Sequence, residues 1–432
     1  MTNDPLRALV SRWTRSPTLT LWTGNAASIL LRFALSVLMA RLAGVRLYGL
    51  FAIATMYSAI LARAVDLGAT NGLSFIAKAE PESTLHLLRI SALHSLIAAP
   101  IVFALFAGVA QLPFGDPDSN NLFHHYSLAA TALCTSQLFN GLTLSLLVPL
   151  QRYAWYGIAS AASPLISMGV ILTFAATDSI GEQQLLLAAA AGEAAAAFIT
   201  VATILRYAQR PSAPRSAMAA ARSLYAYSIR SFPGQLLKFG GQRADRLLLA
   251  SLLPPAAVGV YSLAVSLRDQ ALTPINLHAL VVRNKFIELL QVRNDAAAAR
   301  VYLWQQVKVT LMAAAPLAVV ASVAAPFIIP TLYGRDFQST GGVAAILFLT
   351  IPFIAVSNSG WSLVLAAGRP ALFSILFTCA TAIMLAALAI GVGLNELSGV
   401  AWANLAATGL ATAMWSMTAV FLLRRQRNER VA

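Results

Sequence analysis

The organisation of this chain follows from residues 228–251, which read SIRSFPGQLLKFGGQRADRLLLAS. The stretch is long and apolar enough to cross a bilayer as an α-helix, yet it carries charged side chains that hydrocarbon disfavours. Its polar residues recur at steps of three and four, which places them on one stripe of a helix. They are Ser228, Ser231, Gln235, Lys238, Gln242, Asp245 and Arg246. Because a charge at the centre of a bilayer is costly, we expect this stripe to face a partner or a water-filled cavity.

The composition indicates an all-α polytopic membrane protein. Of the 432 residues, 58% are hydrophobic and only 11% are charged, whereas soluble chains are about 25% charged. Apolar runs long enough for membrane helices recur from end to end, and a β-barrel would show short alternating segments instead. The net charge of +14 first suggests nucleic-acid binding. Most basic residues lie at the ends of apolar runs, where membrane topology requires them, so we expect no nucleic-acid partner.

Nothing in the sequence indicates a cofactor or a metal. The two cysteines, Cys134 and Cys379, lie within apolar runs and predict neither a disulfide framework nor a metal site. The chain has neither the glycine-rich, lysine-containing loop that cradles ATP phosphates nor a His-Glu-x-x-His motif. We therefore expect no cofactor and no metal-dependent enzyme.

We predict twelve transmembrane helices in two parallel six-helix lobes around a central cavity. The predicted spans cover residues 19–44, 48–73, 86–110, 124–150, 153–176, a sixth ending at 207, 228–251, 257–280, a ninth ending near 330, 341–367, 371–391 and 399–423. Residues 209–222 are rich in Pro, Ser and Arg. We interpret them as a cytoplasmic linker between an N-terminal lobe, residues 1–208, and a C-terminal lobe, residues 223–432, that ends in a basic tail.

The distribution of basic residues predicts the topology. With the N-terminus in the cytoplasm, the cytoplasmic segments hold nearly all of the arginine and lysine residues outside the spans. The outer loops hold only Arg46 and Arg335, with five acidic residues. These are Asp116, Asp118, Asp178, Glu182 and Glu396. Because membrane proteins retain positive loops inside, this asymmetry predicts that both termini are cytoplasmic.

A shift by 210 positions reveals a weak internal repeat. Residues 42–54 then lie over residues 252–264. The polar positions of the first span, Asn25, Ser28, Arg32 and Ser36, fall on Gln235, Lys238, Gln242 and Arg246 in the seventh. Since each half holds six predicted spans, the two halves would have the same orientation. Such parallel lobes enclose a cleft that alternating access opens to either side.

Two basic residues near the middle of predicted spans indicate an anion-accepting cavity. Arg32 and Lys238 have no acidic residue within one helical turn. A hydrated cavity is one explanation for them. The alternative is that they bind backbone carbonyls freed at kinks such as Pro233, or pair with Glu193. Glu193 itself is a candidate proton or cation site, although one carboxylate is a weak signal.

Further charges lie near the ends of the spans. Arg268 is a cavity candidate, because it is adjacent to Asp269 and the two side chains should point in different directions without neutralising each other. One of Arg243 and Arg246 is expected to pair with Asp245. We also expect Arg63 and Asp66, spaced i,i+3, to form an ion pair. The candidate substrate-binding residues are Asn25, Arg32, Gln235, Lys238, Gln242, Arg246 and Arg268. The candidate ion-coupling or structural residues are Arg63, Asp66 and Glu193.

Several motifs are similar to those of a known family. ARLAGVRLYGLF at 40–51, followed by Asp66-Leu-Gly68, resembles the opening signature of the polysaccharide transporter family, which includes O-antigen and exopolysaccharide repeat-unit flippases. QRADRLLL at 242–249 with VGVY at 258–261 resembles its second-half counterpart. LYGRDF at 332–337 and AAGRP at 366–370 resemble later landmarks. The chain departs from the family in AGVR, where Leu-Gly-Pro is common, and in its short outer loops.

The resemblance implies a function in a bacterial inner membrane. Such a protein moves an undecaprenyl-diphosphate-linked oligosaccharide from the cytoplasmic to the periplasmic leaflet for lipopolysaccharide or exopolysaccharide assembly. Membrane lipids, a polysaccharide polymerase and a chain-length regulator are candidate partners. Two alternatives stay open. A cation-coupled drug or metabolite antiporter of the same superfamily would favour acidic cavity residues. A membrane-embedded glycan polymerase would need a larger outer catalytic loop.

Overall fold

The structure is a computed structural model that describes residues 17–109, 117–208 and 217–428. Within these ranges the secondary structure is helical, with no strand. The chain forms two compact units. The N-terminal unit comprises the described residues up to Leu236 together with Ala250–Ala256, and the C-terminal unit comprises Leu237–Leu249 and the described residues from Ala257 onward.

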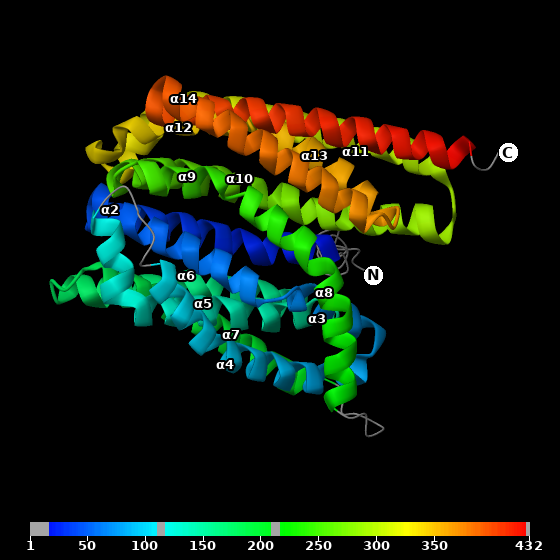
Figure 1. Ribbon diagram of the computed structural model, residues 1–432, viewed down its shortest axis with the longest axis horizontal. Helices are drawn as coiled ribbons and strands as arrows, with labels where there is room; N and C mark the ends of the chain where they lie inside the picture. The colour runs from blue at the N-terminus through cyan, green and yellow to red at the C-terminus, as the bar shows by residue number, and fades with distance from the viewer. Residues whose placement is uncertain (1–16, 110–116, 209–216, 429–432) are drawn as a thin grey trace, which may run out of the picture. The chain divides into compact units, whose positions relative to one another are not determined.

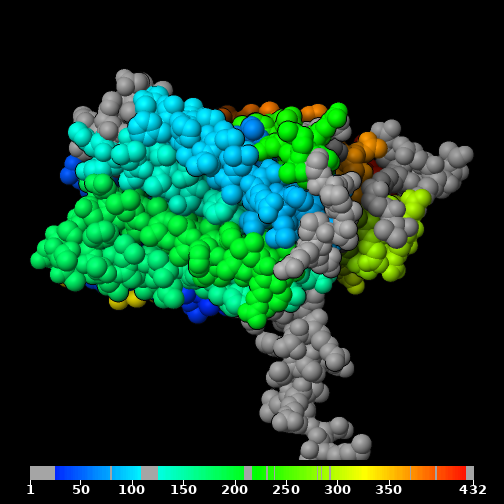
Figure 2. Space-filling view, turned by 90° about the horizontal axis from the view of Figure 1, so that it is seen from below, coloured from blue at the N-terminus to red at the C-terminus, as the bar shows by residue number. Residues whose placement is uncertain are grey.

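The N-terminal unit is a bundle of long apolar helices (Figure 1). Its elements are α2 (Pro17–Val65), α3 (Ala69–Ala79), η1 (Pro81–Ser83), α4 (Thr84–Val109), α5 (Pro117–Leu147), α6 (Tyr153–Ala176), α7 (Glu182–Tyr207) and the first part of α8 (Ala217–Gly241). Helix α7 packs against α5 and α6, while α2 packs against α6 and α5. Figure 2 shows the outer faces of α4, in light blue, and α7, in green. Both helices expose large apolar side chains, as expected of faces that meet lipid.

Glycines set two features of this unit. Gly44 has φ 71° and interrupts α2 between the first and second predicted spans. Left-handed backbone is costly for residues with a Cβ, so the break falls at the residue that tolerates it. Gly192 of α7 packs directly on α6, where an added Cβ would overlap the backbone carbonyl oxygen of Ser163.

The second predicted span ends early, at Val65, because Leu67 and Gly68 also have positive φ.

The C-terminal unit is built from α9 (Ala244–Leu252), α10 (Pro255–Ile287), the π-helical turn η2 (Glu288–Val292), α11 (Ala296–Tyr333), η3 (Arg335–Phe337), α12 (Gln338–Phe348), α13 (Ile351–Ala366) and α14 (Pro370–Asn428). Helix α11 packs on α12 and α13, and α13 packs on α14. One core cluster gathers Phe286, Phe373 and Trp415, with the Trp361 ring against its edge. This packing holds α10, α13 and α14 around the site described below.

The prediction of one continuous helix over residues 228–251 is wrong. Helix α8 ends at Gly241 and α9 begins at Ala244, with Gln242 and Arg243 in a turn closed by a hydrogen bond from the Arg243 N–H to the Gly240 carbonyl. Two consecutive glycines weaken a helix because the backbone has more freedom to lose. Since the helix breaks here, Asp245 and Arg246 do not continue the stripe that begins at Ser228.

The described residues contain seven helices that are long and apolar enough to cross a membrane, or eight if α12 and α13, bent by 42°, form one broken span. The range Asn25–Val65 counts once, although Gly44 divides it, and α14 contributes both Ala371–Leu394 and Leu397–Arg424. The other predicted spans fall on α5, on α8 with α9, and on α10. A multi-pass membrane protein is therefore confirmed, while the count of twelve and the orientation of the termini stay predictions.

The turns agree with the predicted repeat. Gly44 interrupts α2, and Pro254, which the shift of 210 positions places opposite it, lies between α9 and α10. The break at Gln242 has no counterpart in α2, which continues as helix through Arg32 and Phe33. The two halves therefore share a helix–turn–helix beginning but differ in the continuity of the first helix.

Candidate functional site

The C-terminal unit contains an open cavity of about 370 Å³. It is lined by the end of α8, by the α8–α9 turn and by α9, α10, α13 and α14. Its charged lining residues are three arginines, Arg243, Arg246 and Arg268, and two aspartates, Asp245 and Asp269. Aromatic rings from Phe239, Trp361, Phe377 and Trp415 also face it. The cavity therefore combines a small excess of positive charge with flat apolar surfaces.

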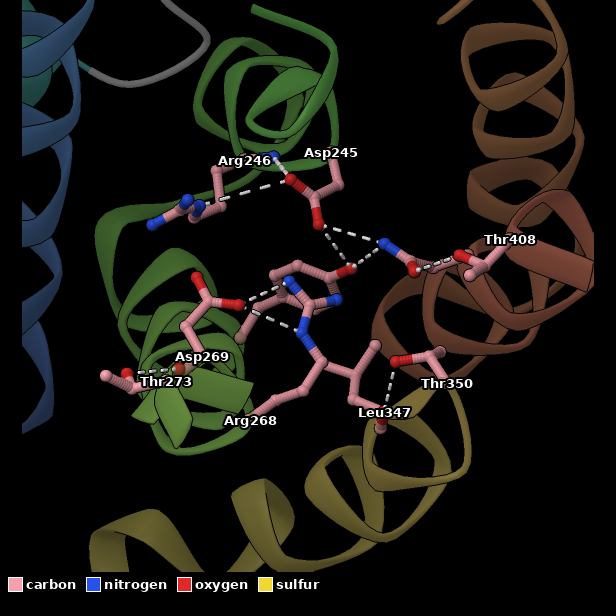
Figure 3. Close-up of polar contacts among 10 residues, drawn as sticks. Asp245, Arg246, Arg268, Asp269, Thr273, Leu347, Thr350 and Thr408 are labelled. Atoms are coloured by element: carbon pink, nitrogen blue, oxygen red, sulfur yellow. Dashed lines mark hydrogen bonds and ion pairs between the residues drawn. The ribbon is translucent and has the colours of Figure 1, made fainter. Parts of the chain in front are cut away.

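A buried hydrogen-bond network centred on Asp245 joins three helices (Figure 3). The Asp245 carboxylate of α9 accepts hydrogen bonds from the Tyr261 hydroxyl of α10 and from the Asn404 side-chain amide of α14, both at 3.0 Å. Its other oxygen accepts the backbone N–H of Arg246 at 2.7 Å. Tyr261 is fully buried and Asp245 is 3% exposed. With three donors around it, this carboxylate positions α9 against α10 and α14.

Arg268 contacts the residue next to it in the chain. Its Nε and Nη2 atoms both donate to Asp269 Oδ1, at 3.1 and 2.8 Å. The prediction that these two side chains do not neutralise each other is wrong, because the arginine side chain is long enough to fold back to its neighbour. Arg268 is 7% exposed, whereas half of the Asp269 side chain is exposed. Arg268 thus lines the cavity as one half of an ion pair.

Arg246 contacts its neighbouring aspartate less closely than Arg268 does. Its Nε atom lies 4.0 Å from Asp245 Oδ1, which confirms that one of the two neighbouring arginines pairs with this aspartate. The Nε atom is also buried and has no hydrogen-bond partner among the described residues. The Arg243 guanidinium instead lies 3.6 Å from the centre of the Phe239 ring. Arg246 is therefore the cavity arginine with buried donor capacity left over.

The other predicted site residues divide between the units. Gln242 is exposed and lines the same cavity as Arg246 and Arg268. Gln235 lies half-buried in α8. The backbone of Lys238 also belongs to α8, and its side chain lies outside the described residues.

In the N-terminal unit, α2 carries Asn25, which is buried, and Arg32, which is exposed and donates from Nε to Ser28 Oγ at 3.3 Å. Glu193 of α7 accepts hydrogen bonds from Asn140 Nδ2 at 2.5 Å and from Ser163 Oγ at 3.1 Å. These contacts give Glu193 a role in holding α5, α6 and α7 together.

The Arg63–Asp66 ion pair is confirmed, with 3.8 Å between Nη1 and Oδ2. Asp66 is 2% exposed and also accepts from the Thr70 hydroxyl at 2.9 Å. Nearby, His94 of α4 hydrogen-bonds to the Val65 carbonyl oxygen at 2.8 Å through Nε2 and to the Tyr225 hydroxyl at 2.7 Å through Nδ1. Because a carbonyl can only accept, Nε2 carries the proton of this contact, and Nδ1 faces the Tyr225 hydroxyl, which can donate or accept.

Sequence reasoning missed several polar residues of the cavity. Asn276 of α10 accepts from the Asn358 amide at 2.9 Å, and the oxygen of Asn358 accepts from Trp361 Nε1 at 2.8 Å. Asn404 was missed as well. The sequence did contain a signal for these residues, which is an asparagine inside an otherwise apolar run. A polar side chain at membrane depth needs a partner. The sequence gives no indication of which partner it finds.

These helices define a multi-pass membrane protein. Structural comparison supports this class. An inward-facing multidrug resistance MATE family transporter of the MOP superfamily aligns with a TM-score of 0.72 and 13% identity, over 93% of this chain and 96% of that one. The lipid II flippase MurJ, in an inward closed conformation, aligns with a TM-score of 0.70 and 14% identity, over 94% and 87%. At such identities the likeness shows the fold alone.

The family follows from the sequence. A model described as polysaccharide biosynthesis protein matches residues 38–341, so the chain belongs to that family, and the predicted resemblance to polysaccharide transporters is confirmed. A further structural relative is a MOP superfamily transporter from Pyrococcus furiosus, whose description reports a binding pocket of reverse polarity. It aligns with a TM-score of 0.66 and 14% identity, over 95% of each chain. No curated protein sequence matches this chain.

Proposed function

We propose that this protein is a flippase that moves an undecaprenyl-diphosphate-linked oligosaccharide from the cytoplasmic to the periplasmic leaflet of a bacterial inner membrane. Membership of a polysaccharide biosynthesis family supports the pathway. A fold shared with a lipid II flippase supports lipid-linked cargo. The observation that carries the proposal is the arginine excess of the cavity in the C-terminal unit.

The cavity suits the polar part of such a substrate. A diphosphate is anionic, and arginine binds phosphate through a planar fork of N–H donors. Arg246, whose Nε forms no hydrogen bond with another described residue, is the first candidate for this contact, and Arg268 is the second. The half-buried ring of Trp361 offers a surface on which a sugar ring can stack. The volume of about 370 Å³ falls in the usual range for small-molecule sites, about 300–1,000 Å³.

Transport would proceed by alternating access of two lobes, residues 1–208 and 223–432, each with six spans and with both termini in the cytoplasm. In this scheme Arg32 and Lys238 contribute positive charge to the substrate pathway, while the prenyl chain stays in lipid. Neutralisation of the cationic residues by the diphosphate favours closure. Arg63 with Asp66, and Glu193, are candidates for coupling to a cation or proton gradient. The protein then acts as a transporter and not as an enzyme, and a polymerase and a chain-length regulator would use its product.

Mass spectrometry of lipid-linked glycans tests the proposal in cells that contain no redundant flippase. Depletion of the protein should cause an undecaprenyl-diphosphate oligosaccharide to accumulate and a surface polysaccharide to disappear. Complementation with Arg246→Glu or Arg32→Glu should fail although the protein reaches the membrane, because each change places a negative charge where the anion passes. Arg335→Glu, at an exposed position just after α11, serves as the control and should complement. Unchanged lipid-linked glycans on depletion would refute the flippase function.

A second candidate is a cation-coupled antiporter for drugs or metabolites. The MATE-like fold favours it, as do the buried carboxylates Asp66 and Asp245. This function predicts efflux of organic cations driven by a sodium or proton gradient in proteoliposomes. The flippase predicts no such efflux, and the cationic lining of the cavity argues for an anionic cargo.

A further inference from the structure

A groove lies on the C-terminal unit between the first turns of α11 and the last turns of α14. Figure 1 shows these two segments beside each other near the C-terminus. The groove has a volume of about 350 Å³ and is lined by seven residues, including Arg300, Val301, Trp304 and Arg424. None of the seven is acidic. The groove is separate from the Asp245 cavity, with which it shares no lining residue.

The groove carries two positive charges without partners in the described part of the chain. Arg300 and Arg424 are both exposed, and neither forms an ion pair with another described residue. The acidic residue that precedes α11, Asp295, is occupied as a helix cap, where its side chain accepts the N–H of Ala298 at 2.9 Å. Two guanidinium groups that line the same groove from different helices can therefore share one anion.

The sequence of α11 places this groove at headgroup level. Arg300, Trp304 and Lys308 follow one another at steps of four on one helix face, and all three are exposed. The next 26 residues, 309–334, carry no charge. At 1.5 Å per residue they extend about 39 Å, enough for a hydrocarbon core of about 30 Å. Arg300 then lies eight residues, about 12 Å, beyond Lys308 on the water side, with the tryptophan between them where membrane proteins prefer it.

The apolar surface continues from the groove towards the hydrocarbon. Val301 is 63% exposed at the groove, and Met312 is 77% exposed one turn beyond Lys308 on the same face. A ligand with an anionic group between the arginines and an acyl chain along this face would satisfy both parts of the surface. A free anion would satisfy only the arginines.

We propose that this groove binds an anionic phospholipid of the surrounding bilayer, with its phosphate between Arg300 and Arg424 and an acyl chain along Trp304 and Met312. A zwitterionic phospholipid carries its own cation beside the phosphate, so it gains less from a groove whose described lining has two positive charges and no acidic residue. Basic pockets between transmembrane helices are a known form of headgroup recognition. This inference does not depend on the cargo of the transporter.

Quenching of tryptophan fluorescence by brominated lipids tests the proposal on the full-length protein in nanodiscs. The signal of Trp304 is obtained as the difference between the wild type and Trp304→Phe. Dibrominated phosphatidylglycerol should quench this signal more strongly than dibrominated phosphatidylcholine at equal mole fraction. Each arginine near a membrane surface contributes enough to change the association constant about fivefold. Arg300→Gln should therefore weaken phosphatidylglycerol binding about fivefold, and Arg300→Gln with Arg424→Gln about thirtyfold.

Two comparisons make the result specific. Arg89→Gln with Arg369→Gln removes the same charge from exposed positions outside the groove, and it should keep the preference for phosphatidylglycerol. The double variant Arg300→Lys with Arg424→Lys retains both charges and should keep most of the preference for phosphatidylglycerol. This comparison holds even if the glutamine variants prove unstable. Equal quenching by the two lipids, or an equal loss in the Arg89 and Arg369 control, would overturn the proposal. Loss of the preference on addition of millimolar inorganic phosphate would also overturn it, because the site would then bind a soluble anion.

Discussion

The network around Asp245 makes a quantitative prediction for Tyr261→Phe. The change removes only the hydroxyl that donates to Asp245 at 3.0 Å, within a site where the tyrosine is fully buried. A hydrogen bond to a charged group contributes about 1.5–3 kcal/mol in soluble proteins. In membrane proteins side-chain hydrogen bonds average about 0.6 kcal/mol, with a maximum near 1.7 kcal/mol. Since Asp245 keeps its bonds from Asn404 and from the Arg246 backbone, we expect a loss of about 1–2 kcal/mol.

The free energy of unfolding can be measured by titration with sodium dodecyl sulfate, followed by circular dichroism. Tyr302→Phe is the matched control. That ring packs edge-on against Phe286 at 5.2 Å in the same unit, and its hydroxyl forms no hydrogen bond with another described residue. We expect the control to change stability by less than about 0.5 kcal/mol, as for substitutions that remove no buried interaction.

A double-mutant cycle then tests whether the network acts as a unit. Asn404→Leu removes a second donor to the same carboxylate oxygen, so Tyr261→Phe and Asn404→Leu should be coupled by about 0.5 kcal/mol or more. A loss for Tyr261→Phe no larger than that of its control, together with additive effects in the cycle, would refute the reasoning. The Asp245 carboxylate would then not join α9 to α10 and α14 energetically.

Three further predictions concern other parts of the chain. Gly192→Ala should cost about 1–3 kcal/mol by forcing α7 away from the α6 backbone, whereas Gly169→Ala, which meets open space, should be neutral or stabilising in the same titration with sodium dodecyl sulfate. The hydrogen bond from Lys285 lowers the pKa of Glu288 below its ordinary 4.5, so this carboxylate favours the fold above about pH 4.5 and loses that effect as the pH falls through its folded pKa. A stability difference between wild type and Glu288→Gln that does not shrink on acidification would contradict this. His94→Phe keeps a ring but loses two hydrogen bonds, and should cost about 1–3 kcal/mol, which His94→Gln should partly restore.

Much of the helix layout could be predicted because apolar runs and turn residues are local signals. Residues 153–176 were predicted as a span and form α6 with the same bounds, and α7 ends at Tyr207 as expected. The Arg63–Asp66 pair was also predictable, since residues three apart face each other on a helix. In each case the deciding information lies within a few turns of the chain.

The site could be predicted only in part. The sequence singled out Gln242, Arg246 and Arg268 as cavity residues, and the structure brings them around one cavity. It also predicted one polar stripe through residues 228–251, which the turn after Gly241 interrupts. Helix periodicity assumes a continuous helix, and the energy of a glycine-rich break depends on what packs around it.

By itself, the sequence determined a basic, multi-pass helical membrane protein of a polysaccharide biosynthesis family, because hydropathy, charge at helix ends and family motifs are properties of the linear chain. Only the tertiary structure decided that Asp245 meets Tyr261 and Asn404, and that Arg300 and Arg424 line one groove. These partners are separated by 16 to 159 residues. The packing of whole helices determines which polar side chains pair. Each buried polar group needs a hydrogen-bond partner, and the fold decides which donor or acceptor lies within reach.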